Sequence, residues 1–149
     1  MKLYTLGFTK KSAKQFFELL RKSNIQELVD IRLYNVSQLA GFTKGADLKY
    51  FLEELCNIQY VHNVSFAPTK EILDDYKKKK ITWDEYEERF IDLLGHRYID
   101  GNLIKDFSKE SEGICLLCSE PTPENCHRRL VAEFIKREFP DSAIEIVHL

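Results

Sequence analysis

KLYTLGFTKKSAKQFFELLRKSNIQELVDIR, residues 2–32, decides the fold class of this chain. An apolar, β-rich run at 2–8 is followed by a helical segment in which Ser12 and Gln15 have the spacing of a capping box. A second apolar run at 25–32 has the composition of a buried strand. A strand, a helix and a strand in this order are the βαβ pattern of a parallel sheet.

The rest of the chain continues this alternation. Helical spacing and apolar β-rich runs predict helices at 46–58, 70–80, 82–99, 101–107 and 123–139, and strands at 59–64, 113–118 and 142–149. We therefore expect a single three-layer, Rossmann-like α/β domain over residues 1–149, with about five mostly parallel strands and helices on both faces.

Several side chains in these helices have predicted places. The helix at 46–58 should turn Leu55 inward together with its other apolar residues. Thr82 and Glu85 form a second capping box, and the aromatic stripe that follows within 83–94 is typical of a core rather than of a ligand site. The lysine run at 77–80 is typical of a solvated helix end, with phosphate binding as the alternative.

Composition limits the classes of function. The 149 residues include no apolar run long enough for a membrane helix, and the N-terminal apolar stretch is too short for a signal peptide. We therefore expect a cytoplasmic protein, without a membrane partner, whose thiols stay reduced. The net charge of −2 does not favour nucleic acid as a partner, although it leaves room for a local basic patch.

Residues that carry chemistry gather at the predicted strand ends. In open parallel sheets, ligands bind beyond the carboxyl ends of the strands. Gly7 and Thr9 follow the first strand, Asp30 and Arg32 end the second, and Cys118 ends a later one. Asp30 and Arg32 are two residues apart on a strand, so they share a face, either as a structural ion pair or as part of a site.

A zinc site is one interpretation of ICLLCSEPTPENCHRR, residues 114–129. Cys115, Cys118, Cys126 and His127 would supply the four ligands of a tetrahedral ion. However, strand alternation puts Cys115 and Cys118 on opposite faces. The adjacent Cys126 and His127 would also have to turn the same way at a helix start. Zinc therefore stays an alternative.

Strand alternation favours a thiol site instead. Cys118 and Glu120 share the face that ends in the predicted crevice, whereas Cys115 faces the core. Cys126 falls at a helix start, where unpaired N–H groups and partial positive charge lower a thiol's pKa or hold a phosphate. Arg128 would add positive charge there, unless it forms a surface pair with Glu120.

LLCSEPTPENCHRRL, residues 116–130, resembles the signature of the DUF488 family, in which a strand ends in Cys-x-Glu and Cys-His-Arg follows at a helix start. TLGF at 5–8 is similar to the family's T-I-G-H, with Phe8 in place of histidine. VDIRLYNVS at 29–37 is similar to V-D-V-R-x-x-P-x-S, with Asn35 in place of proline. The resemblance implies an α/β fold, points toward an enzyme, and adds Ser37 to the matched residues. If the family's histidine carries a proton, the change at Phe8 implies a divergent or weaker activity.

The leading prediction is an enzyme that acts on an anionic, phosphate-bearing substrate, such as a nucleotide or a nucleic acid. The predicted catalytic residues are Cys118, Glu120, Cys126 and His127. The predicted substrate-binding residues are Gly7, Thr9, Asp30, Arg32, Ser37 and Arg128. We expect no cofactor and no bound metal. The alternatives are a non-catalytic module that binds a nucleotide or nucleic acid, and a zinc-stabilised domain.

Overall fold

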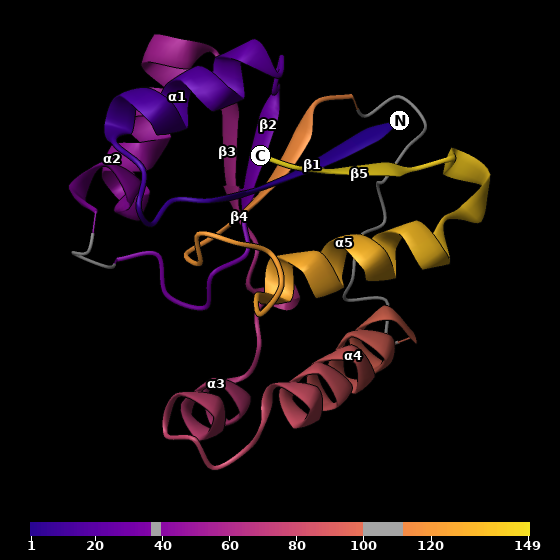
Figure 1. Ribbon diagram of the computed structural model, residues 1–149. Helices are drawn as coiled ribbons and strands as arrows, with labels where there is room; N and C mark the ends of the chain where they lie inside the picture. Colours follow the sequence, from indigo (N-terminus) through magenta and orange to yellow (C-terminus); the bar gives the residue numbers. More distant parts are fainter. Residues whose placement is uncertain (37–39, 100–111) are drawn as a thin grey trace.

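The computed structural model describes residues 1–36, 40–99 and 112–149. Its centre is a five-stranded sheet in the order β3-β2-β4-β1-β5, in which all paired strands are parallel (Figure 1). The strands are β1 (Lys2–Gly7), β2 (Glu27–Asp30), β3 (Gln59–His62), β4 (Ile114–Cys118) and β5 (Glu145–His148). The predicted α/β class is confirmed, with parallel pairing throughout the described sheet.

Helices cover both faces of the sheet (Figure 1). They are α1 (Ala13–Lys22), α2 (Gly45–Tyr50), α3 (Lys70–Lys77), α4 (Trp83–Ile99) and α5 (His127–Glu138). The first two pack on one face, and α4 and α5 pack on the other, with α3 against α4. Within the described ranges, no helix has the length and apolar character needed to cross a membrane. The predicted helix at 101–107 and the site residue Ser37 lie outside the described residues.

Alternate residues of strand β4 belong to two different hydrophobic cores, one on each face of the sheet. Ile114 and Leu116 join the cluster formed with α4 and α5, whereas Cys115 and Leu117 join the cluster formed with α1 and α2. All four side chains are buried, because a central parallel strand is covered on both faces. The predicted place of Cys115, as a small core residue away from Cys118, is confirmed.

Both predicted capping boxes form. Ser12 Oγ accepts from the Gln15 backbone N–H at 3.2 Å, and Gln15 Oε1 accepts from the Ser12 N–H at 2.9 Å. Thr82 and Glu85 make the same reciprocal pair at the start of α4. These contacts satisfy donors that a helix start otherwise leaves unpaired.

The expectation for Leu55 was wrong. A π-helical turn, η2 (Phe51–Leu55), follows α2 directly and leaves Leu55 66% exposed. A π turn holds more residues than an α turn, so residues after it rotate away from the face that α-helical spacing assigns. Ile58 fills the core beyond the turn, where its N–H donates to the Leu52 carbonyl.

The topology opens a crevice at the carboxyl end of β4. The chain leaves β1 and β2 toward the face covered by α1 and α2, but it leaves β4 toward α5 on the other face. Since β4 lies between β1 and β2, connections diverge on both sides of its end. Such a divergence is where ligands bind in open parallel sheets.

Candidate thiol site at the end of β4

Three side chains meet in this crevice. Cys118 ends β4, Cys126 is the N-cap residue of α5, and His127 is its first residue. Their sulfur and nitrogen atoms all lie within 4.8 Å of one another, and all three residues are buried. The turn between β4 and α5 therefore points both Cys126 and His127 toward Cys118, as a zinc site requires. Cys115, the fourth candidate zinc ligand, lies on the other face of β4 and cannot join them.

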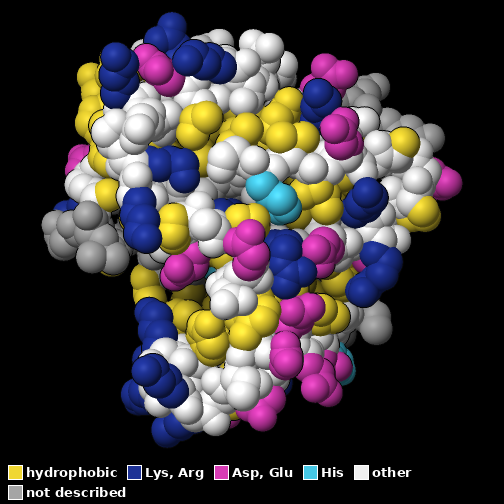
Figure 2. All heavy atoms as spheres, viewed as in Figure 1, with side chains coloured by type: hydrophobic (Ala, Val, Ile, Leu, Met, Phe, Trp, Pro, Cys, Tyr) yellow, Lys and Arg dark blue, Asp and Glu magenta, His cyan; other side chains and the backbone are white. Residues whose placement is uncertain are grey.

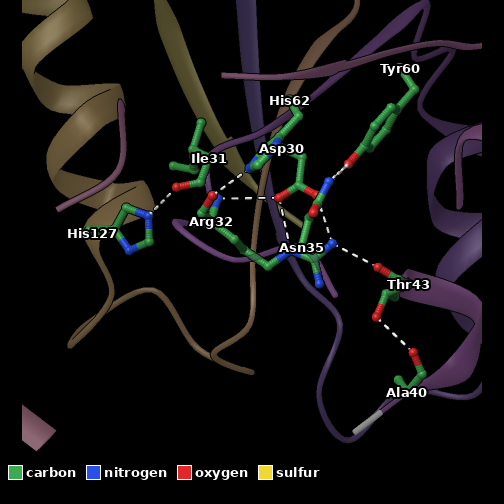
Figure 3. A network of polar contacts seen from close by, with 9 residues as sticks. All are labelled: Asp30, Ile31, Arg32, Asn35, Ala40, Thr43, Tyr60, His62 and His127. Atoms are coloured by element: carbon green, nitrogen blue, oxygen red, sulfur yellow. Dashed lines mark hydrogen bonds and ion pairs between the residues drawn. The ribbon is translucent and has the colours of Figure 1, made fainter. Parts of the chain in front are cut away.

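The hydrogen bonds of His127 define its tautomer. Its Nε2 lies 2.8 Å from the backbone carbonyl of Ile31, and a carbonyl only accepts, so Nε2 carries the proton and donates (Figure 3). The Nδ1 atom then offers a lone pair, and it lies 3.4 Å from Cys118 Sγ. The ring also packs edge-on against Phe90, which limits its rotation. His127 is thus held as a proton acceptor that faces a thiol.

The two thiols of the cluster have opposite acidities. A hydrogen bond from the Cys126 thiol lowers the pKa of Cys118 below its ordinary value, with help from the backbone N–H groups of Ser119 and Glu120 and the charge of Arg128, and against the effect of burial. Burial raises the pKa of Cys126 well above its ordinary value, the neighbouring Cys118 adds to the rise, and a hydrogen bond and the charge of His127 act against it. Cys118 is therefore the more acidic thiol of the pair, and Cys126 is the one that donates the hydrogen bond.

Asp30 and Arg32 form a buried ion pair beside this cluster. The Arg32 Nε and Nη2 atoms donate to Asp30 Oδ1 and Oδ2 at 2.8 and 2.6 Å, and Nη2 also donates to the Thr43 carbonyl at 2.7 Å (Figure 3). Tyr60 donates its hydroxyl proton to Asp30 Oδ2 at 2.7 Å, and burial is the main reason that the pKa of Tyr60 is raised. Asp30 and Arg32 therefore do form the structural ion pair that their spacing allowed, and their contact with a substrate stays a prediction.

Phe8 accounts for one departure from the expected motif. The Arg32 guanidinium carbon lies 5.1 Å from the centre of the Phe8 ring, which is fully buried. A cation over an aromatic face is stabilised by the ring's quadrupole. Phe8 thus supports the buried arginine, and it brings no proton carrier to the site.

Arg128 lies inside the protein, without a described acidic partner. Its Nη1 atom donates to the Glu120 backbone carbonyl at 2.5 Å, while Nε and Nη2 are buried and bond to no described residue. The surface pair considered for Glu120 and Arg128 is therefore replaced by a backbone contact, and the Glu120 side chain is exposed at the cleft.

Gly7 and Thr9 join the loop after β1 to the loop after β4. A Cβ atom on Gly7 would lie 1.6 Å from the Glu120 carbonyl oxygen and 2.8 Å from Arg128 Nη1, so only glycine fits there. Thr9 Oγ1 donates to the Ser119 carbonyl at 2.7 Å. Both residues therefore position the strand end that carries Cys118, and their contact with a substrate stays a prediction.

The cluster lies on the wall of a cleft of about 450 Å³. The cleft opens between α3, the start of α4 and the loops after β2 and β4, and Figure 2 shows hydrophobic side chains gathered in this hollow. Its walls combine an aromatic set with polar residues beside the cluster: Tyr34, Tyr76, Trp83, Tyr86, Arg32, Lys77, Ser119, Glu120 and Asn125. Tyr86 belongs to the core as predicted, but with Trp83 it also faces the cleft.

Sequence reasoning missed the aromatic wall. Tyr76 comes from α3 and does not follow a strand end, whereas Tyr34 lies in the loop after β2 but carries no charged or nucleophilic group, so neither was selected. The usable signal was the density of aromatic residues around the lysine run, which we interpreted as core and solvated surface.

Fold and site together define an α/β protein with a parallel sheet and a buried Cys-Cys-His cluster at the carboxyl edge of that sheet. The chain belongs to the family described as "Domain of unknown function DUF488", which matches residues 12–135. No curated protein and no solved structure matches it. The resemblance inferred from the Cys-x-Glu and Cys-His-Arg motifs is thereby confirmed.

Proposed function

We propose that this chain is an enzyme that acts on a small anionic, phosphate-bearing substrate, with Cys118 as the nucleophile. The observation that carries the proposal is the 3.4 Å contact between Cys118 Sγ and His127 Nδ1, with His127 Nε2–H committed to the Ile31 carbonyl. A thiol beside a nitrogen acceptor whose tautomer is fixed by a third group is the arrangement that activates cysteine nucleophiles.

The proton of the Cys118 thiol passes to His127 Nδ1, which leaves a thiolate beside an imidazolium. The Ile31 carbonyl then holds the Nε2–H of that imidazolium, and the Cys126 thiol donates to the thiolate. Cys126 is a poor nucleophile here, because its raised pKa keeps it protonated. His127, which then holds the thiol's proton, is the group available to return it to a leaving group, and Glu120, the other predicted proton carrier, lies exposed at the cleft edge.

Positive charge and free N–H groups support an anionic substrate. The N-cap residue of α5, Cys126, makes no side-chain capping bond, so the first turn of this helix keeps N–H donors beside the cleft. Lys77 lines the opposite wall. Arg32 and Arg128 are held by the protein itself, so we assign them a fixed positive field rather than a clamp on the substrate.

The aromatic wall favours a substrate with a flat ring. Trp83 and Tyr86 stack with their ring centres 4.9 Å apart, and Tyr76 packs edge-on against Trp83 at 5.7 Å. Tyr34 is more than half exposed on the same cleft. Flat aromatic surfaces near a phosphate site bind nucleobases by stacking. A mononucleotide-like substrate therefore fits both halves of the cleft.

Iodoacetamide labelling tests the thiolate. The protein is alkylated at several pH values, and the adduct at each of the four cysteines is quantified by mass spectrometry. We expect Cys118 to react fastest and to remain reactive at a lower pH than Cys56, because the pKa of Cys118 is lowered and that of the partly exposed Cys56 is raised by burial. Uniformly slow labelling of Cys118 and Cys126, with midpoints near the ordinary thiol value of about 8.5, would contradict the proposal.

A binding module without chemistry makes a different prediction. If the protein is an enzyme, the wild type converts the ligand that it binds, and Cys118→Ser still binds this ligand but no longer converts it. If the protein is a binding module, the wild type binds the ligand without converting it. Arg32→Ala and Arg128→Ala do not separate the two, because both side chains are buried and their loss would also lower the stability of the protein. Lys77→Ala is the better test of anion binding, because Lys77 is exposed.

A further inference from the structure

The Cys118, Cys126 and His127 side chains have the geometry of metal ligands. In a tetrahedral zinc site, a sulfur at about 2.3 Å and a nitrogen at about 2.05 Å from the ion lie about 3.6 Å apart. Cys118 Sγ and His127 Nδ1 are already 3.4 Å apart, and Cys126 Sγ lies within 4.8 Å of both. An ion would therefore need only small side-chain movements.

The second shell is also in place. Histidine ligands usually donate their other ring N–H to a carbonyl or a carboxylate, which fixes the ring and strengthens the metal bond. His127 does this through Nε2–H and the Ile31 carbonyl, and so its Nδ1 lone pair points to the two sulfurs. Two thiolates and an imidazole select a thiophilic divalent cation such as Zn²⁺ over Mg²⁺ or Ca²⁺.

The fourth position of such a site is open. Cys115, the remaining cysteine of the motif, is buried in the core on the other face of the sheet. Cys118, Cys126 and His127 all line the 450 Å³ cleft, so the fourth position faces the cleft. Structural zinc sites are closed by four protein ligands, whereas three ligands and an open position are typical of sites that exchange ligands.

We propose that Cys118, Cys126 and His127 form a three-ligand site for Zn²⁺ whose fourth position faces the substrate cleft. Binding releases two protons to solvent, one from the Cys126 thiol and one from the Cys118–His127 pair, so that two thiolates and the neutral His127 Nδ1 donate their lone pairs. Because Cys118 cannot be a ligand and a free nucleophile at once, the ion also controls the reaction; this second part rests on the proposed function.

Cobalt titration of the full chain tests the site directly. Tetrahedral thiolate-bound Co²⁺ gives a ligand-to-metal charge-transfer band and intense visible bands, which do not depend on any activity. We expect one Co²⁺ per chain, displaced by Zn²⁺. Cys118→Ser and Cys126→Ser should each weaken binding by at least about tenfold, since losing even an outer-shell partner costs about 10- to 100-fold. The matched control Cys56→Ser should bind within about twofold of the wild type. No charge-transfer band, or a band that survives both substitutions, would overturn the site.

A second measurement needs no variant. Zn²⁺ should slow the iodoacetamide labelling of Cys118 in the wild type by at least about tenfold, while Cys56 keeps its rate. Fast labelling of Cys118 that zinc leaves unchanged would refute the metal site and leave the proposed nucleophile intact. Zinc binding to a chain whose metal-free Cys118 labels slowly would support the metal site and refute the proposed nucleophile.

Discussion

Gly7→Ala is the substitution whose effect the structure specifies most closely. The added Cβ would lie 1.6 Å from the Glu120 carbonyl oxygen, whereas ordinary contacts begin at 3.4 Å, so the two groups must separate by about 1.8 Å. The atom that has to move is backbone, and the same oxygen accepts the bond from Arg128 Nη1. Overpacking costs about 1–3 kcal/mol. An orphaned donor on a buried charged group costs about 1–3 kcal/mol more.

We therefore expect Gly7→Ala to lower the free energy of unfolding by about 3 kcal/mol or more. Urea denaturation followed by circular dichroism measures this, with the m-value showing whether the transition stays two-state. Gly95→Ala is the matched control, because a Cβ added there would meet nothing within 4 Å and alanine suits a helix better than glycine by up to about 1 kcal/mol.

The same variant has a second readout at the site. If the loop after β4 shifts, the backbone N–H groups that face Cys118 shift with it, and the labelling rate of Cys118 should fall while that of Cys56 stays constant. A Gly7→Ala protein as stable as the wild type within about 0.5 kcal/mol would refute this description of the strand end.

Two further predictions concern the neighbours of the cluster. Asp30→Ala leaves the buried Arg32 without its carboxylate and should cost about 3–5 kcal/mol in urea unfolding, whereas Asp92→Ala, on the exposed face of α4, should change stability by less than about 0.5 kcal/mol; equal effects would argue against the buried pair. Trp83 is the chain's single tryptophan, so adenosine monophosphate bound in the cleft should quench its fluorescence, and ribose 5-phosphate should not. If adenosine monophosphate leaves the Trp83 fluorescence unchanged, and Lys77→Ala and the wild type give the same result, the idea of a stacked base would be contradicted.

Local patterns predicted much of the fold. Alternation along β4 assigned Cys115 and Cys118 to different faces, and the two capping boxes located the starts of α1 and α4. These features depend on backbone periodicity and on partners three residues away, which are readable in one segment. The π turn that exposes Leu55 has no such local signature, and so α-helical spacing gave the wrong face.

Only part of the candidate site could be predicted from the sequence. The rule about strand ends located Cys118 and Asp30, because topology alone brings those positions to one edge of the sheet. The partner of His127 is a backbone carbonyl 96 positions earlier in the chain, and side-chain identity carries no information about it. The cleft wall from Tyr34, Tyr76 and Trp83 likewise depends on how α3 and α4 pack against the sheet.

Replacing His127 by glutamine is the most direct test of the central claim, that Cys118 is a nucleophile activated by this histidine. Glutamine can still donate an N–H toward the Ile31 carbonyl, but it places no nitrogen acceptor against the thiol. A hydrogen bond to a charged group is worth about 1.5–3 kcal/mol, so the labelling rate of Cys118 should fall by about 10- to 100-fold.

The measurement is the iodoacetamide rate of Cys118 in His127→Gln and in the wild type, with Cys56 in the same sample as the reference. We predict that only Cys118 slows, in a variant that remains folded by circular dichroism. An unchanged Cys118 rate would contradict the claim, because the thiol would then owe nothing to the nitrogen that lies 3.4 Å from it.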